Sequence, residues 1–455
     1  MEKDNRAFKK RAFRFVIPLM AVVAIAFIVL AVHSERERAR ALGAMPTTPE
    51  ARVHGQLATL LDEAGASDAT TLPSELRPKL DAIARWKTVL QRYDEEVDAE
   101  FHSSDRFCWS CWTEYSPEAI ADIGRFLETH QDFLRTLRTT AAQGGPMVAV
   151  PLPPNSVDPS HTLKARYLAR LLALDLLYQA RHGDPNVAVD DAVAGLELGF
   201  ALAEVPTLFS QTARFSCSLI TCQAIAAGFP PGTLPDGAYS KLLHTIERDP
   251  GRTPMVAATL ELGTTFLSEF DALRNKGWLG RYNDLGFIVD SPLPTFFGKA
   301  HRLAYASPLA RPWWNWDASN LAALATEISP HTALPLFEAE ERYAVGGPGL
   351  GPNAQLFVQS VHNDLVFQAS HEAHVRLLVL GLTLEQHPSP PESLAAITDV
   401  LPQETFVDPF TGGPVHYRVT GSRFVLYSVG KNRQDDHGWH NYREGDLVWR
   451  GKLDE

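Results

Sequence analysis

The chain has 455 residues, enough for about three domains and a substantial buried core. Its 42 basic and 54 acidic side chains give a formal net charge of −12, so we expect no nucleic-acid partner, which would need a basic face. Hydrophobic residues make up 45%, with 30 glycines and 32 prolines, which excludes collagen, coiled-coil rods and wholesale disorder.

The N-terminus predicts a membrane anchor. Residues 1–14 are basic, and Phe15–Val32 is an uncharged, apolar run that spans about 27 Å as a helix. Six Lys or Arg precede the run, and three follow it shortly afterwards. By the positive-inside rule this predicts a single-pass protein of the bacterial inner membrane, with a cytoplasmic tail at 1–14 and the body outside the cytoplasm.

A cleaved signal peptide is the alternative, because Val29-Leu30-Ala31 is an acceptable cleavage site. The apolar run is longer than the usual signal-peptide core of about 7–15 residues, which favours an uncleaved anchor. The third alternative is an anchored protein whose body faces the cytoplasm.

Helical patterns dominate the body, 51–386, after a predicted stalk at 33–50. Apolar residues recur every three or four positions between Glu75 and Phe101, and Ser116-Pro117-Glu118 is a helix start. That second helix should end near Gly144. Further helices are predicted at about 160–182, 185–205, 207–227, 238–247, 254–275 and 353–386. A Pro-rich linker occupies 146–159, and an aromatic, loop-rich stretch occupies 277–353.

Pro159, Pro206 and Gly251-Arg252 punctuate the middle at steps of about 46 residues, the length of a helical-hairpin repeat. Both an α-solenoid-like stack and an irregular bundle fit this spacing. After Pro391 the pattern changes to strands, at Val415–Val419, Phe424–Val429 and Leu447–Trp449. The sequence thus predicts a mainly α protein with a small antiparallel β unit at 387–455.

The tail carries an ordered set of motifs: Asp408-Pro409-Phe410, Pro414 and Tyr417, then Tyr427-Ser428-Val429-Gly430, then Asp446-Leu447-Val448-Trp449. Over about 60 residues it resembles the C-terminal β domain of type II secretion major pseudopilins. The whole chain resembles large bacterial membrane-anchored proteins with a helical body and this tail. However, Arg14-Phe15-Val16-Ile17-Pro18 lacks the Gly and Glu of the prepilin cleavage site, and a long body separates anchor from tail. A fibre subunit is therefore not expected.

The resemblance implies a calcium site in the acidic loop of the tail. By position, Asn432 and Asp446 match the first and the late ligand, with Asp435 and Asp436 between them. Carboxylate and carbonyl oxygens are what calcium prefers. Lys431, Arg433 and the amide at Asn432 weaken such a site, and a metal-free hydrogen-bonded loop is the alternative.

The four cysteines form two pairs, Cys108 with Cys111 and Cys217 with Cys222. Outside the cytoplasm an even count favours disulfides, with three connectivities open. Free buried thiols, a zinc site and a redox pair are the alternatives.

Two further sequence motifs are candidate binding sites. His371-Glu372-Ala373-His374 resembles a zinc motif, but its histidines are three apart instead of four, which favours a polar helix stripe. Trp313, Trp314 and Trp316 could bind glycan, fill a core or sit at the bilayer interface.

The sequence contains no catalytic signature and predicts no specific reaction. We expect a non-enzymatic, membrane-anchored scaffold or interaction protein of the bacterial envelope, with an envelope protein as partner and calcium as the candidate cofactor. The alternatives are an envelope hydrolase of cell-wall glycan or peptide with its site in 277–353, and a component of a secretion or pilus-like machine.

Overall fold

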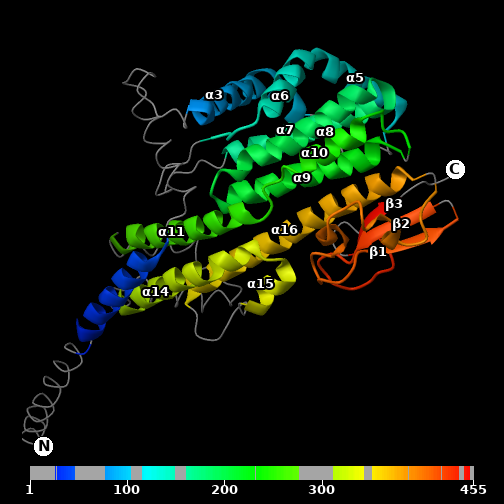
Figure 1. Cartoon of the computed structure of the whole chain (residues 1–455). Helices are drawn as coiled ribbons and strands as arrows, with labels where there is room; N and C mark the ends of the chain where they lie inside the picture. Colours follow the sequence, from blue (N-terminus) through cyan, green and yellow to red (C-terminus); the bar gives the residue numbers. More distant parts are fainter. Residues whose placement is uncertain are drawn as a thin grey trace, which may run out of the picture. The chain divides into compact units, whose positions relative to one another are not determined.

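The computed structural model divides into two compact units (Figure 1). Unit 1 comprises 1–46, 263–327 and 346–359, and unit 2 comprises 47–262, 328–345 and 360–455. Within them the structure describes residues 26, 28–46, 77–103, 115–148, 160–230, 232–275, 311–342, 351–387, 389–421, 423–439 and 445–450.

The first described residues of unit 2 form a continuous helical run made of α3 (Arg77–Arg92), the π-turn η2 (Tyr93–Val97) and α4 (Asp98–Ser103), as the apolar periodicity predicts. The predicted helix start at Ser116 is also confirmed, because the Ser116 hydroxyl accepts a hydrogen bond from the Ala119 N–H at 3.3 Å. The single helix expected from there to Gly144 is wrong. At His130, whose backbone leaves helical geometry (φ −100°, ψ 16°), it divides into α5 (Pro117–Thr129) and α6 (Gln131–Gln143).

The centre of unit 2 consists of α7 (Ser160–His182), α8 (Pro185–Ala203) and α9 (Leu208–Gly228), each packed against the other two, with α10 (Ala238–Ile246) on α8. The caps explain the boundaries. The Asp184 carboxylate accepts from the Asn186 N–H at 2.9 Å, and the Thr207 hydroxyl accepts from the Ser210 N–H at 3.1 Å. The mutual packing of α7, α8 and α9 is that of a helical bundle.

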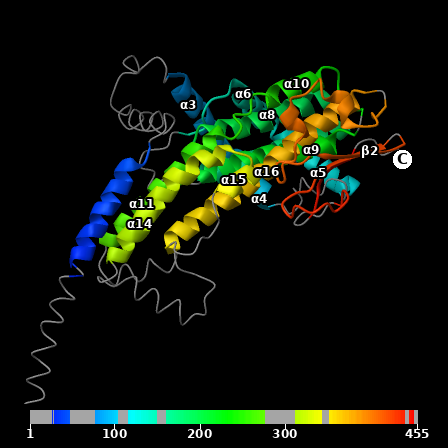
Figure 2. The same ribbon diagram turned by 60° about the horizontal axis from the view of Figure 1, so that its bottom comes forward.

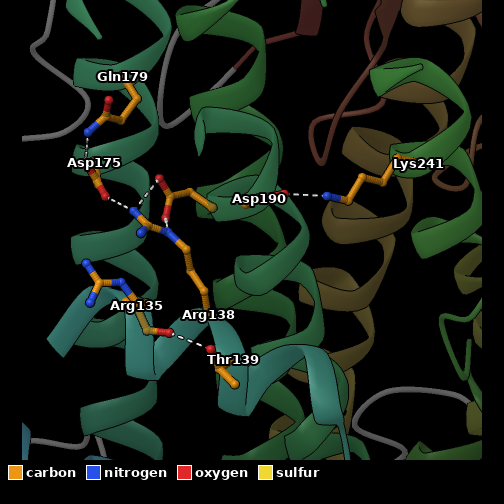
Figure 3. Close-up of polar contacts among 8 residues, drawn as sticks. Arg135, Arg138, Thr139, Asp175, Gln179, Asp190 and Lys241 are labelled. Carbon is orange, nitrogen blue, oxygen red and sulfur yellow. Dashed lines mark hydrogen bonds and ion pairs between the residues drawn. The ribbon is translucent and has the colours of Figure 1, made fainter. Parts of the chain in front are cut away.

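A buried ion cluster joins α6, α7 and α8 (Figure 3). Arg138 on α6 donates from Nε to Asp191 on α8 at 2.5 Å and from Nη2 to Asp175 on α7. Burial raises the pKa of both carboxyls against the opposing effect of Arg138. Nearer the surface, Lys241 on α10 pairs with Asp190 on α8. These ion pairs hold α6, α7 and α8 in place relative to one another, so we assign the cluster a structural role.

The stretch 277–353 contains helices that the sequence did not predict: α14 (Arg311–Ile328), the 3₁₀ turn η5 (Ser329–Ala333) and α15 (Leu336–Arg342). Before them lies α11 (Thr253–Asn275) and after them α16 (Pro352–Glu385), both close to prediction. Residues 276–310 and 343–350 lie outside the described part of the chain, as does the linker at 149–159.

The predicted β hairpin is confirmed. Strands β1 (His416–Thr420), β2 (Arg423–Ser428) and β3 (Leu447–Arg450) form an antiparallel sheet in the order β1-β2-β3. Thr420 pairs with Arg423 across the turn, and Ser428 pairs with Leu447. Gly430 ends the second strand with φ +67°, and a Cβ there would lie 2.5 Å from the Gly445 carbonyl oxygen.

The β unit shares a core with the helical body. Leu426 and Trp449 belong to the same buried apolar cluster as Leu377–Leu384 of α16 and the α7–α9 bundle. The closest approach is at Gly381, where an added Cβ would lie 2.4 Å from the Trp449 indole nitrogen. The sheet is thus built onto α16, and it lies beside the C-terminal part of that helix in Figures 1 and 2.

In unit 1, residues 28–44 form a helix, so 33–44 of the predicted stalk are helical. None of the helices among the described residues is both long and apolar enough to cross a membrane. Most of the predicted anchor, residues 15–25 and 27, lies outside those residues, and the anchor stays a prediction.

Candidate binding cavity

A polar cavity of about 550 Å³ lies in unit 2 between α9, the turn that joins α10 to α11, and α16. Charged side chains dominate its lining: Arg214 from α9, Asp249 and Arg252 from the turn, His371, Glu372 and Arg376 from α16, and Glu404 from the 3₁₀ turn η7 (Gln403–Phe406). Three arginines therefore face three carboxylates.

Asp249 and Gly251 determine the shape of the turn that joins α10 to α11. The Asp249 carboxylate accepts from the Gly251 N–H at 3.0 Å, and Gly251 adopts φ +63°, a conformation that favours glycine. This geometry turns the Gly251 carbonyl toward Arg214, whose Nη2 donates to it at 2.6 Å. It also sends the Arg252 side chain to α16.

Glu372 is fully paired. Its Oε1 accepts from Arg252 Nε at 2.5 Å and from Gln368 at 3.1 Å, and its Oε2 accepts from Arg252 Nη2 and from Arg376 at 3.2 Å. Arg376 also donates to the Val407 carbonyl at 2.5 Å. This network ties the turn, α16 and the segment before the β unit into one wall of the cavity.

Unlike Glu372, Arg214 is a buried charged group whose hydrogen-bond donors are not all satisfied. It is 1% exposed, and its Nε and Nη1 have no hydrogen-bond partner among the described residues. Its guanidinium carbon lies 4.5 Å from the Phe215 ring centroid. Burial lowers the pKa of Arg214, while Asp249 and Glu372 raise it. An unpaired buried N–H costs about 1–3 kcal/mol, so these donors favour an acceptor in the cavity.

His371 and Gln368 add further unpaired atoms. His371 is 4% exposed, and neither ring nitrogen has a hydrogen-bond partner in the described part of the chain, although Nε2 lies 3.5 Å from the Asp249 carboxylate. Burial lowers the pKa of His371, more than Asp249 raises it, and so favours the neutral ring. The Gln368 Oε1 is also unpaired. Three side chains that line the cavity, Arg214, His371 and Gln368, thus carry buried polar atoms without a hydrogen-bond partner among the described residues.

The zinc reading of His371 and His374 finds no support in this arrangement. His374 contacts Gln223 at 3.4 Å, away from the cavity, and its Nδ1 lies 2.8 Å from the Ser370 carbonyl. No three His, Cys, Asp or Glu side chains within the described ranges are grouped to hold a metal. His371, Glu372 and His374 do lie on one long helix, α16, where His371 is buried.

The four predicted calcium ligands lie in one loop but face two ways. Asn432 donates to Asp436 at 2.8 Å, and Asp446 accepts from the backbone N–H groups of Asp436 at 3.3 Å and Gly438 at 2.6 Å. Asp435 instead accepts from the Tyr427 hydroxyl at 3.0 Å and from the His437 N–H at 2.8 Å. Calcium here stays a prediction.

The cysteines give a partial correction. Cys217 and Cys222 carry free, buried thiols on α9, and burial raises the pKa of each to about 12. A bond between these two is excluded by helix geometry, because five residues rise about 7.5 Å, beyond disulfide reach. Cys108 and Cys111 lie outside the described residues, so their pairing stays a prediction.

Sequence reasoning missed Arg214, Asp249, Arg252 and Arg376 as site residues. One signal was present: Arg214 is the sole charged residue of α9, a helix of 21 residues. A charged side chain in an otherwise uncharged, buried helix is costly, so its presence indicates a specific role.

Comparison of the chain with models of known protein families, with curated proteins and with solved structures finds no match.

Proposed function

We propose that the chain is a membrane-anchored interaction protein of the bacterial envelope, a scaffold without catalysis of its own, and that its cavity receives a carboxylate of the partner. The observation that carries the proposal is Arg214, a buried guanidinium that lines a 550 Å³ cavity and has two nitrogens without a partner among the residues that the structure describes. The anchor and the location outside the cytoplasm rest on the charge asymmetry around Phe15–Val32.

Charge decides the class of ligand. Arg214, Arg252 and Arg376 balance Asp249, Glu372 and Glu404, and burial favours neutral His371. A doubly charged phosphate would leave the cavity strongly negative, whereas a singly charged carboxylate adds only one charge. A carboxylate oxygen also accepts a hydrogen bond from a cationic N–H group, the kind of donor that Arg214 carries.

The direct test measures thermal unfolding of the detergent-solubilised full chain against acetate and succinate, with chloride matching the ionic strength. A ligand that binds only the folded chain raises the midpoint by mass action. We expect singly charged acetate to raise it for the wild type and for Arg135→Met, a control with an exposed arginine, and doubly charged succinate to raise it less. Arg214→Met should lose the shift.

The midpoint without added carboxylate separates loss of folding from loss of binding. Replacing a poorly paired buried charge by an apolar side chain is often neutral or stabilising, so we expect Arg214→Met to remain folded. A wild-type midpoint that acetate leaves unchanged, or a shift that survives Arg214→Met, would contradict the proposal.

Partner capture from solubilised membranes then tests the scaffold itself. Wild type and Arg135→Met should retain the same envelope protein, and Arg214→Met should lose it. Equal retention by all three would remove the cavity from partner recognition.

A further inference from the structure

Unit 1 exposes an unusual amount of apolar surface at one end. Trp313 and Trp316 on α14 are 62% and 42% exposed, and their rings meet edge to face with centroids 6.3 Å apart. Trp314, between them, is buried. In the same unit the helix over 28–44 exposes Ile28, Val29, Leu30 and Val32. Large exposed apolar patches mark interaction surfaces.

Two contacts fix how α14 lies along this N-terminal helix. Near its start, Asn315 donates to the Ser34 hydroxyl at 3.1 Å. Further along, a Cβ at Gly263 would lie 2.6 Å from Ala325 and 3.4 Å from Met45. The intervals, Ser34 to Met45 and Asn315 to Ala325, both correspond to about 15–17 Å of helix. The two helices therefore run in the same direction, and in Figure 2 α14 lies alongside the blue helix.

This register places the tryptophans at a chemical boundary. Trp313 is level with about residue 32, where the apolar run Phe15–Val32 ends. Trp316 is level with about residue 35, where the charged flank begins with Glu35 and Arg36. Along the N-terminal helix the sequence changes from apolar to charged at this level. On α14, two exposed indole rings lie at the same level.

We infer that Trp313 and Trp316 sit in the interface of the lipid bilayer and hold the start of α14 against the membrane beside the anchor. Indole rings favour this depth, because the ring is apolar and its N–H reaches the headgroups. Exposed Arg36, one turn beyond Val32, lies where its cation meets phosphate groups. The inference rests on the membrane anchor of the proposed function and assigns α14 a contact with lipid that the anchor alone does not require.

The test is fluorescence quenching of the full chain in phosphatidylethanolamine–phosphatidylglycerol vesicles doped with lipids brominated either near the glycerol or near the chain end. The double variant W313F/W316F removes the indoles and keeps apolar rings. The control W439F removes another exposed tryptophan, in the β unit of unit 2. We expect wild type and W439F to be quenched, more strongly by the shallow bromines, and W313F/W316F to lose that quenched part of the emission.

Vesicle flotation distinguishes the two ways in which the inference can fail. A chain that does not float with the vesicles contradicts the anchor, and with it the membrane part of the proposed function. A chain that floats but shows equal quenching in wild type and W313F/W316F leaves the anchor standing and overturns the interfacial position of α14. Loss of self-association on W313F/W316F, with no lipid quenching in wild type, would assign the patch to a second copy of the chain.

Discussion

At the scale of single residues, the cost of burying charge explains which polar groups are structural and which are available. Arg138 and Glu372 are surrounded by partners that satisfy them. Arg214 and His371 are more deeply buried, yet they keep nitrogens without a hydrogen-bond partner among the described residues. Buried charges are normally paired, so this contrast is the basis for proposing a binding site at Arg214 and a structural role for Arg138. Residue type and spacing alone do not reveal it.

Asp364 gives a pH-dependent prediction. It lies half-buried on α16 and accepts from the Thr212 hydroxyl at 2.6 Å, and burial raises its pKa from 3.8 to about 6. Between these values the folded chain holds a proton that the unfolded chain has lost, so stability falls as pH rises through the window. Asp364→Asn, which stays neutral and can still accept, should remove this fall and add about 1–3 kcal/mol above pH 6.

Urea unfolding of both chains across this pH range measures the effect. The control D132N alters an exposed carboxylate on α6 and should keep the wild-type profile. A profile for D364N that still falls between pH 3.8 and about 6 would assign the fall to other groups.

Asp446 tests the calcium prediction. It is fully buried, and burial together with Asp436 and Asp435 raises its pKa, against the two backbone N–H groups that lower it. A divalent cation would relieve this repulsion among carboxylates. Calcium should therefore raise the unfolding midpoint of the full chain, and Asp446→Ala should abolish that rise, whereas exposed Asp399→Ala should keep it. An unmoved wild-type midpoint would leave a metal-free hydrogen-bonded loop.

At the scale of elements, the helices whose ends carry caps or prolines could be predicted almost to the residue. Ser116, Asp184 and Thr207 each accept from a backbone N–H of the first turn, and such signals are local in sequence. The hairpin was predictable for the same reason, through alternation and turn chemistry.

Elements defined by tertiary packing were missed. The break at His130 follows no proline or glycine, and it occurs where His130 packs on Phe126 and lies 3.2 Å from Glu100 of α4. The start of α14 is aromatic and Pro-rich, which masks its helical period, although Trp314 and Asn315 are buried within unit 1. The cavity was missed likewise, because it joins positions from α9, a turn and α16.

The packing of α16 on β3 predicts an unusual glycine effect. Glycine within a helix normally costs about 0.5–1 kcal/mol relative to alanine. At Gly381, however, a methyl group would lie 2.4 Å from the Trp449 indole, a rigid ring in the shared core. Gly381→Ala should therefore destabilise the chain by about 1–3 kcal/mol.

Gly43 is the matched control, because it lies in a helix with nothing within 4 Å of an added Cβ. Gly43→Ala should be neutral or stabilising in the same denaturant titration. If both exchanges have the same sign, the close approach of Trp449 to α16 is not what determines the cost at Gly381.

At the scale of the whole molecule, the account depends on where the body resides. The proposals put the partner and its carboxylate, the predicted calcium and the lipid contact of α14 on the side of the membrane opposite to residues 1–14. That assignment follows from the six basic residues that precede the apolar run against three beyond it. It determines which partners and ligands the cavity of unit 2 can meet.

The most direct measurement fuses, after Glu455, either a reporter active only outside the cytoplasm or one active only inside it. The account predicts activity of the first reporter, inactivity of the second, and a full-length product in the membrane fraction for both fusions. A stable full-length product that is inactive with the first reporter and active with the second would place the body in the cytoplasm and contradict the account.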